Sequence, residues 1–161
     1  MNSDAQQALP VTSPSGSGRT SFYWLPPILW MAAIFGFSTD YFSAGHTGGI
    51  VESLLRWLSP QISPEQIQTA NLIVRKGAHL TVYAILALLL MRAFRAGSSV
   101  RWTRRWALFS FFIVSIYALL DEYHQTFTSL RTGTPYDSLI DMTGGALALF
   151  GWWLASRRPQ A

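Results

Sequence analysis

Apolar runs of helical length recur along the chain, separated by connections that carry most of its charge. A helix needs about 20 residues, with a range of about 17–25, to cross the hydrocarbon core of a bilayer. The run from Trp106 to Leu120, for example, contains no charged residue. The pattern predicts an all-α membrane protein with four transmembrane helices, at about residues 22–42, 77–95, 104–125 and 138–155.

The connection between the first two spans has a different periodicity. Apolar residues such as Ile50 and Leu54 are interleaved there with Glu52 and Arg56, which is the spacing of an amphipathic helix. The stretch 63–66, Ser-Pro-Glu-Gln, is typical of a second helix start, because it supplies an N-cap serine and the glutamine of a capping box. We therefore expect amphipathic interfacial helices in the 48–75 connection.

The beginning of the chain differs from everything that follows. Residues 1–20 are rich in Ser, Gly, Pro and Gln, a composition that predicts a disordered tail. The apolar run begins only at Phe22, so the pattern of a cleaved signal peptide is not expected. Residues 21–158 then form a single membrane domain.

Composition and charge narrow the class and suggest a topology. Half of the 161 residues are hydrophobic and only 12% are charged, about half the share of a typical soluble domain, which argues against a soluble protein. Eight of the 12 basic residues lie in the tail, between the second and third spans and at the C-terminal end, whereas seven of the eight carboxylates lie on the other side. Positive loops are cytoplasmic, so we expect both termini in the cytoplasm and no binding to nucleic acid.

Polar residues gather where three of the spans begin or end. Ionisable groups at membrane depth are costly and are candidates for function by default, and up-and-down connectivity brings these particular ends together. The candidate substrate-binding residues are Arg75, Lys76, His79, Tyr83, Asp121, Glu122, Gln125, Arg131, Asp137 and Asp141.

Helical geometry assigns these side chains to faces. Asp121 and Glu122 diverge by about 100° around a helix, so we expect Asp121 to point inward with Gln125, and Glu122 to pair with Arg131 or Arg75.

On the fourth span, Asp137 and Asp141 share a face with Gly144 and Ala148, two small residues that permit close helix approach. This face is expected to seat the fourth span against the others and to carry its carboxylates inward.

Less specific interpretations compete for several of these residues. Asp137 is equally compatible with an N-cap, and Tyr83 with the aromatic belt at a membrane interface. Ser38 and His124 are interpreted as local hydrogen-bonding groups. Arg75 and Lys76 by themselves are typical of interface anchors whose long stems reach water.

Taken together and in this order, the motifs resemble the VanZ-like family of small polytopic membrane proteins, over about residues 25–154. The resemblance rests on Arg75-Lys76-x-x-His79-x-x-x-Tyr83, on Asp121-Glu122-x-x-Gln125, and on Arg131 with Asp137 and Asp141-x-x-Gly144. Asp141 departs from the asparagine expected there. The family is named for an accessory protein of glycopeptide (teicoplanin) resistance, so the resemblance implies a multi-pass protein of the bacterial cytoplasmic (inner) membrane with a role in the cell envelope and antibiotic resistance.

Three functions fit these residues. Basic groups suited to phosphates lie beside carboxylates suited to amines, which favours recognition of an envelope lipid or a lipid-linked precursor at the outer face, with membrane lipids as partners. An alternative is an intramembrane enzyme for acyl or phosphoryl transfer or hydrolysis, with His79, Asp121 and Glu122 as catalytic candidates. A third is a structural or assembly protein whose polar network locks the bundle. A metal held by His79 and carboxylates is a weak alternative, because no ligand spacing dictates one, so no cofactor or metal is expected. The sequence leaves the oligomeric state open.

Overall fold

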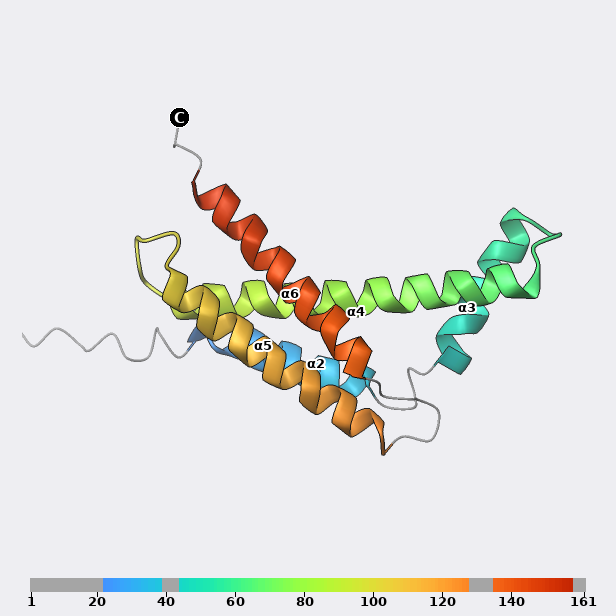
Figure 1. Cartoon of the computed structure of the whole chain (residues 1–161), viewed down its shortest axis with the longest axis horizontal. Helices are drawn as coiled ribbons and strands as arrows, with labels where there is room; N and C mark the ends of the chain where they lie inside the picture. Colours follow the sequence, from blue (N-terminus) through green and yellow to red (C-terminus); the bar gives the residue numbers. More distant parts are fainter. Residues whose placement is uncertain (1–21, 39–43, 128–134, 158–161) are drawn as a thin grey trace, which may run out of the picture.

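The described part of the protein is entirely helical (Figure 1). This structure is a computed structural model that describes residues 22–38, 44–127 and 135–157, and no strand occurs in these ranges. The elements are α2 (Leu25–Phe37), α3 (Ala44–Leu58), α4 (Pro64–Arg95), α5 (Arg104–Gln125) and α6 (Pro135–Ser156). The predicted all-α membrane class is confirmed. The predicted tail at 1–20 lies outside the described residues.

Three described helices, α4, α5 and α6, are long and apolar enough to cross a membrane. The bounds of α5 match the predicted third span, and α6 begins three residues before the predicted fourth. The first span was predicted too long within the described residues: α2 has 13 residues and ends before Ser38, whose N–H bonds to the carbonyl groups of Ile34 and Gly36. At about 1.5 Å per residue such a helix is about 20 Å long, against about 30 Å of hydrocarbon. Residues 39–43 lie outside the described part.

Helix α4 is continuous where the sequence suggested an interfacial helix followed by a span. It starts at the predicted capping box, in which Ser63 accepts from the Gln66 N–H while the Gln66 side chain accepts from the Ser63 N–H. It then runs for 32 residues to Arg95. Because no proline follows Pro64 within it, and a single glycine costs only about 1 kcal/mol in a helix, Gly77 does not interrupt it. The amphipathic helix expected before it is α3, which packs against α4.

Glycines bring α6 unusually close to its neighbours. A Cβ atom on Gly144 would lie 2.2 Å from the backbone oxygen of Leu80 on α4, and one on Gly145 would lie 2.9 Å from Val114 Cγ1 on α5. The prediction that the small face of the fourth span seats it against another helix is therefore confirmed.

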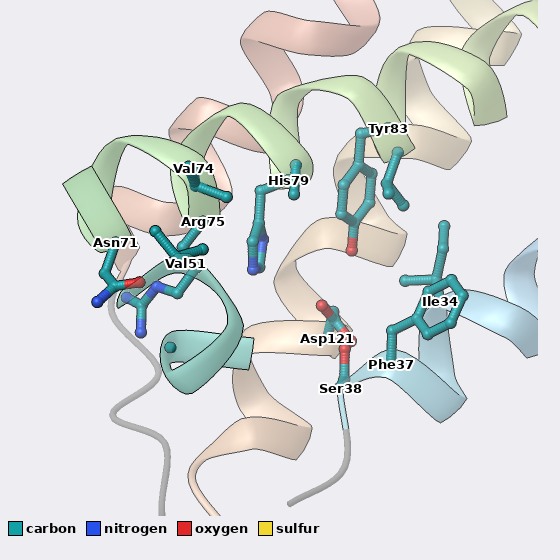
Figure 2. A pocket seen from close by; sticks show the side chains of 13 residues that line it. Ile34, Phe37, Ser38, Val51, Asn71, Val74, Arg75, His79, Tyr83 and Asp121 are labelled. Carbon is teal, nitrogen blue, oxygen red and sulfur yellow. The ribbon is translucent and has the colours of Figure 1, made fainter. Parts of the chain in front are cut away.

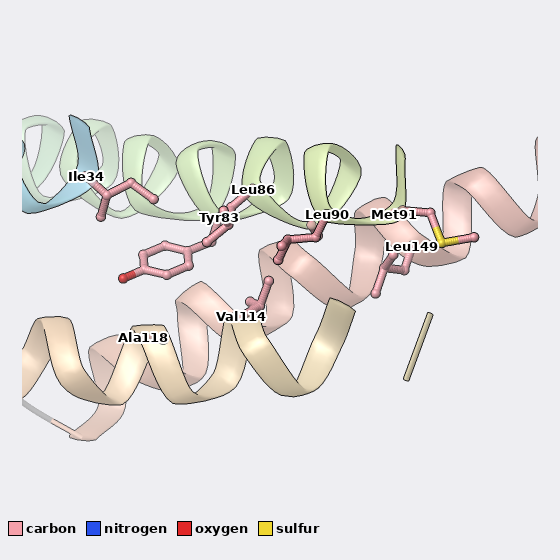
Figure 3. Close-up of a cluster of buried hydrophobic side chains, with 9 residues drawn as sticks. Ile34, Tyr83, Leu86, Leu90, Met91, Val114, Ala118 and Leu149 are labelled. Carbon is pink, nitrogen blue, oxygen red and sulfur yellow. The ribbon is translucent and has the colours of Figure 1, made fainter. Parts of the chain in front are cut away.

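The apolar core lies where α2, α4, α5 and α6 meet (Figure 3). Its buried members are Ile34, Tyr83, Leu86, Ala87, Leu90, Met91, Val114, Ala118 and Leu149. Two polar bonds attach the short helix α2 to this core. The Trp30 indole N–H donates to the carbonyl of Val82 at 2.9 Å, and the Tyr117 hydroxyl donates to the carbonyl of Met31 at 2.6 Å. Large apolar side chains that remain exposed cover the outside of the bundle, as expected of a lipid-facing surface.

Candidate functional site

Buried charge is concentrated where the first turns of α6 and the last turns of α5 meet the middle of α4. Four of the eight carboxylates of the chain are buried there. They are Asp121, Glu122, Asp137 and Asp141. Ionised carboxylates are buried only when other groups compensate their charge, so each one requires an account of its neighbours.

Asp137 is held by two cations from α4. Lys76 forms an ion pair with Asp137 Oδ1, and a guanidinium nitrogen of Arg75 lies 3.6 Å from Asp137 Oδ2. The N-cap interpretation of Asp137 is wrong, because α6 begins two residues earlier, at Pro135. A carboxylate in the first turn still interacts favourably with the helix dipole. Asp137 therefore joins the start of α6 to α4.

His79 and Asp141 form the second contact between these helices. The Nδ1 atom of His79 lies 3.1 Å from Oδ1 of Asp141, and the Asp141 side chain is completely buried. The close approach of Gly144 to Leu80, one turn from Asp141 and next to His79, holds the two side chains in register. Within the described ranges the other oxygen of Asp141, Oδ2, has no hydrogen-bond partner.

The end of α5 is buried on two sides. Asp121 and Glu122 are 5% and 6% exposed, so the expectation that only one of the two would point inward is wrong. Both are covered because α5 packs against α4 and also against α6. Gln125 donates to Asp121 Oδ2 at 3.1 Å, which agrees with the predicted shared face.

Glu122 lies in the same part of the site. Its carboxylate lies close to His79 and Asp141, with the ligand atoms of the three residues all within 4.8 Å of one another. Of the two predicted ion-pair partners, Arg75 contacts Asp137 instead, and Arg131 lies outside the described residues.

A cavity of about 340 Å³ opens beside these groups (Figure 2). Its polar lining residues are Ser38, Asn71, Arg75, His79, Tyr83 and Asp121. The remainder is largely apolar and includes Ile34, Phe37, Val51, Val74, Ala78 and Val82. Figure 2 shows the hydroxyl group of Tyr83 directed toward Asp121. Tyr83 is only 1% exposed, so the aromatic-belt interpretation of this residue is wrong.

Sequence reasoning missed part of this cavity. Asn71 lies one turn before Arg75, so the four-residue spacing that united 75, 79 and 83 extends back to it. Ser38, interpreted as a local hydrogen-bonding group, is buried and lines the cavity, whereas Val51 reaches it from the amphipathic helix α3.

His124 belongs to the same end of α5 and is not one of the residues that line the cavity. Its ring packs against Phe35, with 4.3 Å between the centroids.

The fold and the site together define a small polytopic membrane protein with a charged, amphiphilic cavity at one end of its helices. A family model described as VanZ/LLP1 matches residues 23–156, and the chain belongs to this family. The resemblance inferred from the motifs is thus confirmed. No curated protein and no solved structure matches the chain.

Proposed function

We propose that the protein recognises the headgroup of an envelope lipid or of a lipid-linked precursor at the outer face of the bacterial cytoplasmic membrane. The observation that carries this proposal is the composition of the cavity, whose lining combines charged and polar side chains with apolar ones. A lipid has the same division between a polar headgroup and an apolar chain. Family membership supports a function in the membrane, and the resistance protein for which the family is named supports one in the envelope.

Each part of the cavity suits one part of such a ligand. The guanidinium group of Arg75 offers the paired donors that bind phosphate or carboxylate. Asp121 and Tyr83 provide an acceptor and a hydroxyl group for the amines or hydroxyls of a headgroup. The volume of about 340 Å³ is at the lower end of small-molecule sites, which span about 300–1,000 Å³. The cavity therefore holds a headgroup, while the chains of the lipid lie along the exposed apolar surface.

The distribution of charge supports an orientation in which the cavity faces outward and both termini are cytoplasmic. Eight of the 12 basic residues flank the opposite end of the spans, so the positive-inside rule assigns that end to the cytoplasm together with both termini. The chain contains no cysteine, so single introduced cysteines report the topology. We expect a membrane-impermeant maleimide to label Ser53→Cys in intact cells and to leave Ser99→Cys unlabelled. Labelling in the reverse pattern would place the cavity on the cytoplasmic side.

The test of recognition is the lipid that remains bound on purification. Native mass spectrometry of the protein extracted in mild detergent is expected to find one lipid class enriched over the bulk membrane. Arg75→Gln and Asp121→Asn are expected to reduce that enrichment at least about tenfold, the loss of about 1.4 kcal/mol of binding free energy. Arg56→Gln is the matched control, because Arg56 is an exposed arginine paired with Glu52 away from the cavity.

Equal lipid recovery from wild type and cavity variants would contradict recognition. A chemically modified lipid that depends on His79, Asp121 or Glu122 would instead indicate the enzymatic alternative. Variants that fail to fold while the wild type retains no lipid would favour the structural alternative.

A further inference from the structure

Three side chains from three different helices converge beside the cavity. They are His79 of α4, Glu122 of α5 and Asp141 of α6. One imidazole nitrogen and one oxygen from each carboxylate lie within 4.8 Å of one another. All three residues are at least partly buried, and Asp141 is completely so.

The hydrogen bonding of Asp141 provides a second observation. One of its oxygens lies 3.1 Å from His79 Nδ1, but Oδ2 is fully buried and has no hydrogen-bond partner in the part of the chain that the structure describes. A buried acceptor without a donor costs about 1–3 kcal/mol, and more when it is charged. The helices that hold it in place pack through Gly144, so Asp141 is not free to turn toward water. This oxygen fits a cation that supplies the missing interaction.

We propose that His79, Glu122 and Asp141 bind a divalent cation of the zinc type. An imidazole with two carboxylates is a donor set found in zinc sites, and three protein ligands leave one position of a tetrahedral ion for water or another ligand. Magnesium and calcium prefer six or more oxygen ligands, so the imidazole favours zinc over them. A divalent cation also supplies a positive charge next to the buried carboxylate of Asp141.

The geometry requires only a small contraction. Two ligand atoms about 2.0–2.1 Å from a tetrahedral ion are about 3.4 Å apart. The ligand atoms of the three residues lie within 4.8 Å of one another, so they need to approach by at most about 1.4 Å to reach this separation. Because each ligand comes from a different helix, no short spacing in the sequence marks the site, which is why the sequence alone predicted no metal.

The test uses the full-length protein in detergent, stripped of metal with EDTA and then titrated with Co²⁺. We expect one equivalent to bind, to develop the visible absorption bands of nitrogen- and oxygen-ligated Co²⁺, and to be displaced by Zn²⁺ but not by Mg²⁺. His79→Gln, Glu122→Gln and Asp141→Asn are each expected to weaken binding at least about 100-fold. His124→Gln is the matched control, because it removes a histidine from the same end of the bundle without touching the cluster, and it is expected to bind Co²⁺ like the wild type.

Two outcomes would overturn the metal site: a wild-type protein that takes up no stoichiometric Co²⁺ or Zn²⁺, or binding that survives in all three ligand variants. If the variants do not fold, thermal unfolding of the wild type decides. Zn²⁺ is expected to raise its midpoint after EDTA treatment and Mg²⁺ is not, and an unchanged midpoint would count against the site. None of these measurements involves a lipid, so they succeed or fail independently of headgroup recognition.

Discussion

The middle of α4 and its C-terminal half both bury side chains, and they do so for different reasons. Around Leu86, Leu90 and Met91 the core is apolar and fully buried, and its side chains need only close packing. Around His79 and Tyr83 the same helix is packed against three buried carboxylates and a cavity. Every group there needs a partner, because unpaired polar groups in a low-dielectric interior are costly.

The comparison separates the apolar core, which stabilises the fold by close packing, from the polar region, whose residues are candidates for binding a ligand. In a membrane, helix association depends on close packing, because lipid is as apolar as the core. Polar groups at membrane depth add cost unless they are paired, which makes the buried carboxylates candidates for function. We therefore expect substitutions in the apolar core to act on stability, and substitutions in the polar region to act mainly on binding.

The largest effect on stability is expected at the contact between Gly144 and Leu80, on which both the apolar and the polar region depend. Gly144→Ala places a methyl group 2.2 Å from the backbone oxygen of Leu80, which cannot rotate away, so α6 must move from α4. We expect a loss of about 3 kcal/mol or more in the free energy of unfolding, at the upper end of overpacking effects. Thermal unfolding in detergent measures it. Gly151→Ala is the control, because nothing lies within 4 Å of its Cβ position; equal midpoints for the two variants would refute the close contact.

The next largest loss of stability is expected from a substitution in the apolar core. Leu86 is completely buried, and Leu86→Ala is expected to cost about 2–3 kcal/mol through the cavity that it leaves. Binding of Co²⁺ to the His79 cluster should be preserved in the protein that remains folded. The comparison between the two regions breaks down if metal or lipid binding falls in proportion to stability.

In the polar region, Asp121→Asn tests whether ligand binding can be lost while stability is kept. Asparagine keeps the shape of the side chain and still accepts from Gln125, so the change in the free energy of unfolding is expected to stay within about 1 kcal/mol. The proposed function predicts that the variant nevertheless loses the lipid enrichment of the wild type, measured by native mass spectrometry on equal amounts of folded protein. A collapse of stability would favour a structural network over a site.

The smallest effect is expected at the outer ion pair. Lys76→Met removes one of the two cations beside Asp137 and leaves Arg75 at 3.6 Å. Asp137 is buried but keeps Arg75 as a partner, and Lys76 is partly exposed, so the loss of Lys76 is expected to cost only about 1 kcal/mol. Chemical denaturation should therefore show a small loss, with Arg56→Gln as an exposed pair for comparison. A loss above about 2 kcal/mol in the free energy of unfolding would mean that this ion pair is a main contributor to the stability of the fold.

Much of the fold followed from local signals. The run from Arg104 to Gln125 is bounded by a threonine cap and a polar end, and the structure ends α5 at the predicted residue. The capping box at Ser63 was also visible, because capping depends on residues three positions apart. Short connections then placed the polar ends of the long spans together.

The cavity could not be predicted from the sequence, because it depends on tertiary packing. Val51 lines it only because α3 packs against α4, and no local signal specifies that contact. The burial of both Asp121 and Glu122 requires neighbours on two sides of α5, whereas a helical wheel considers one side. The cluster of His79, Glu122 and Asp141 is likewise assembled from three helices, so no local signal marks it.

The length of α4 has a consequence for how a ligand arrives. Its 32 residues extend about 48 Å, well beyond the roughly 30 Å of the hydrocarbon layer. Figure 1 shows its first turns reaching past α5 and α6 toward α3. On the proposed orientation Arg75 and Lys76 lie at the depth of the lipid phosphates, the turns of α4 before them extend toward water, and the cavity lies at the boundary between the two. On the proposed orientation a ligand at that depth arrives by lateral diffusion within one leaflet, so its surface density, rather than its concentration in solution, sets how often the site is filled.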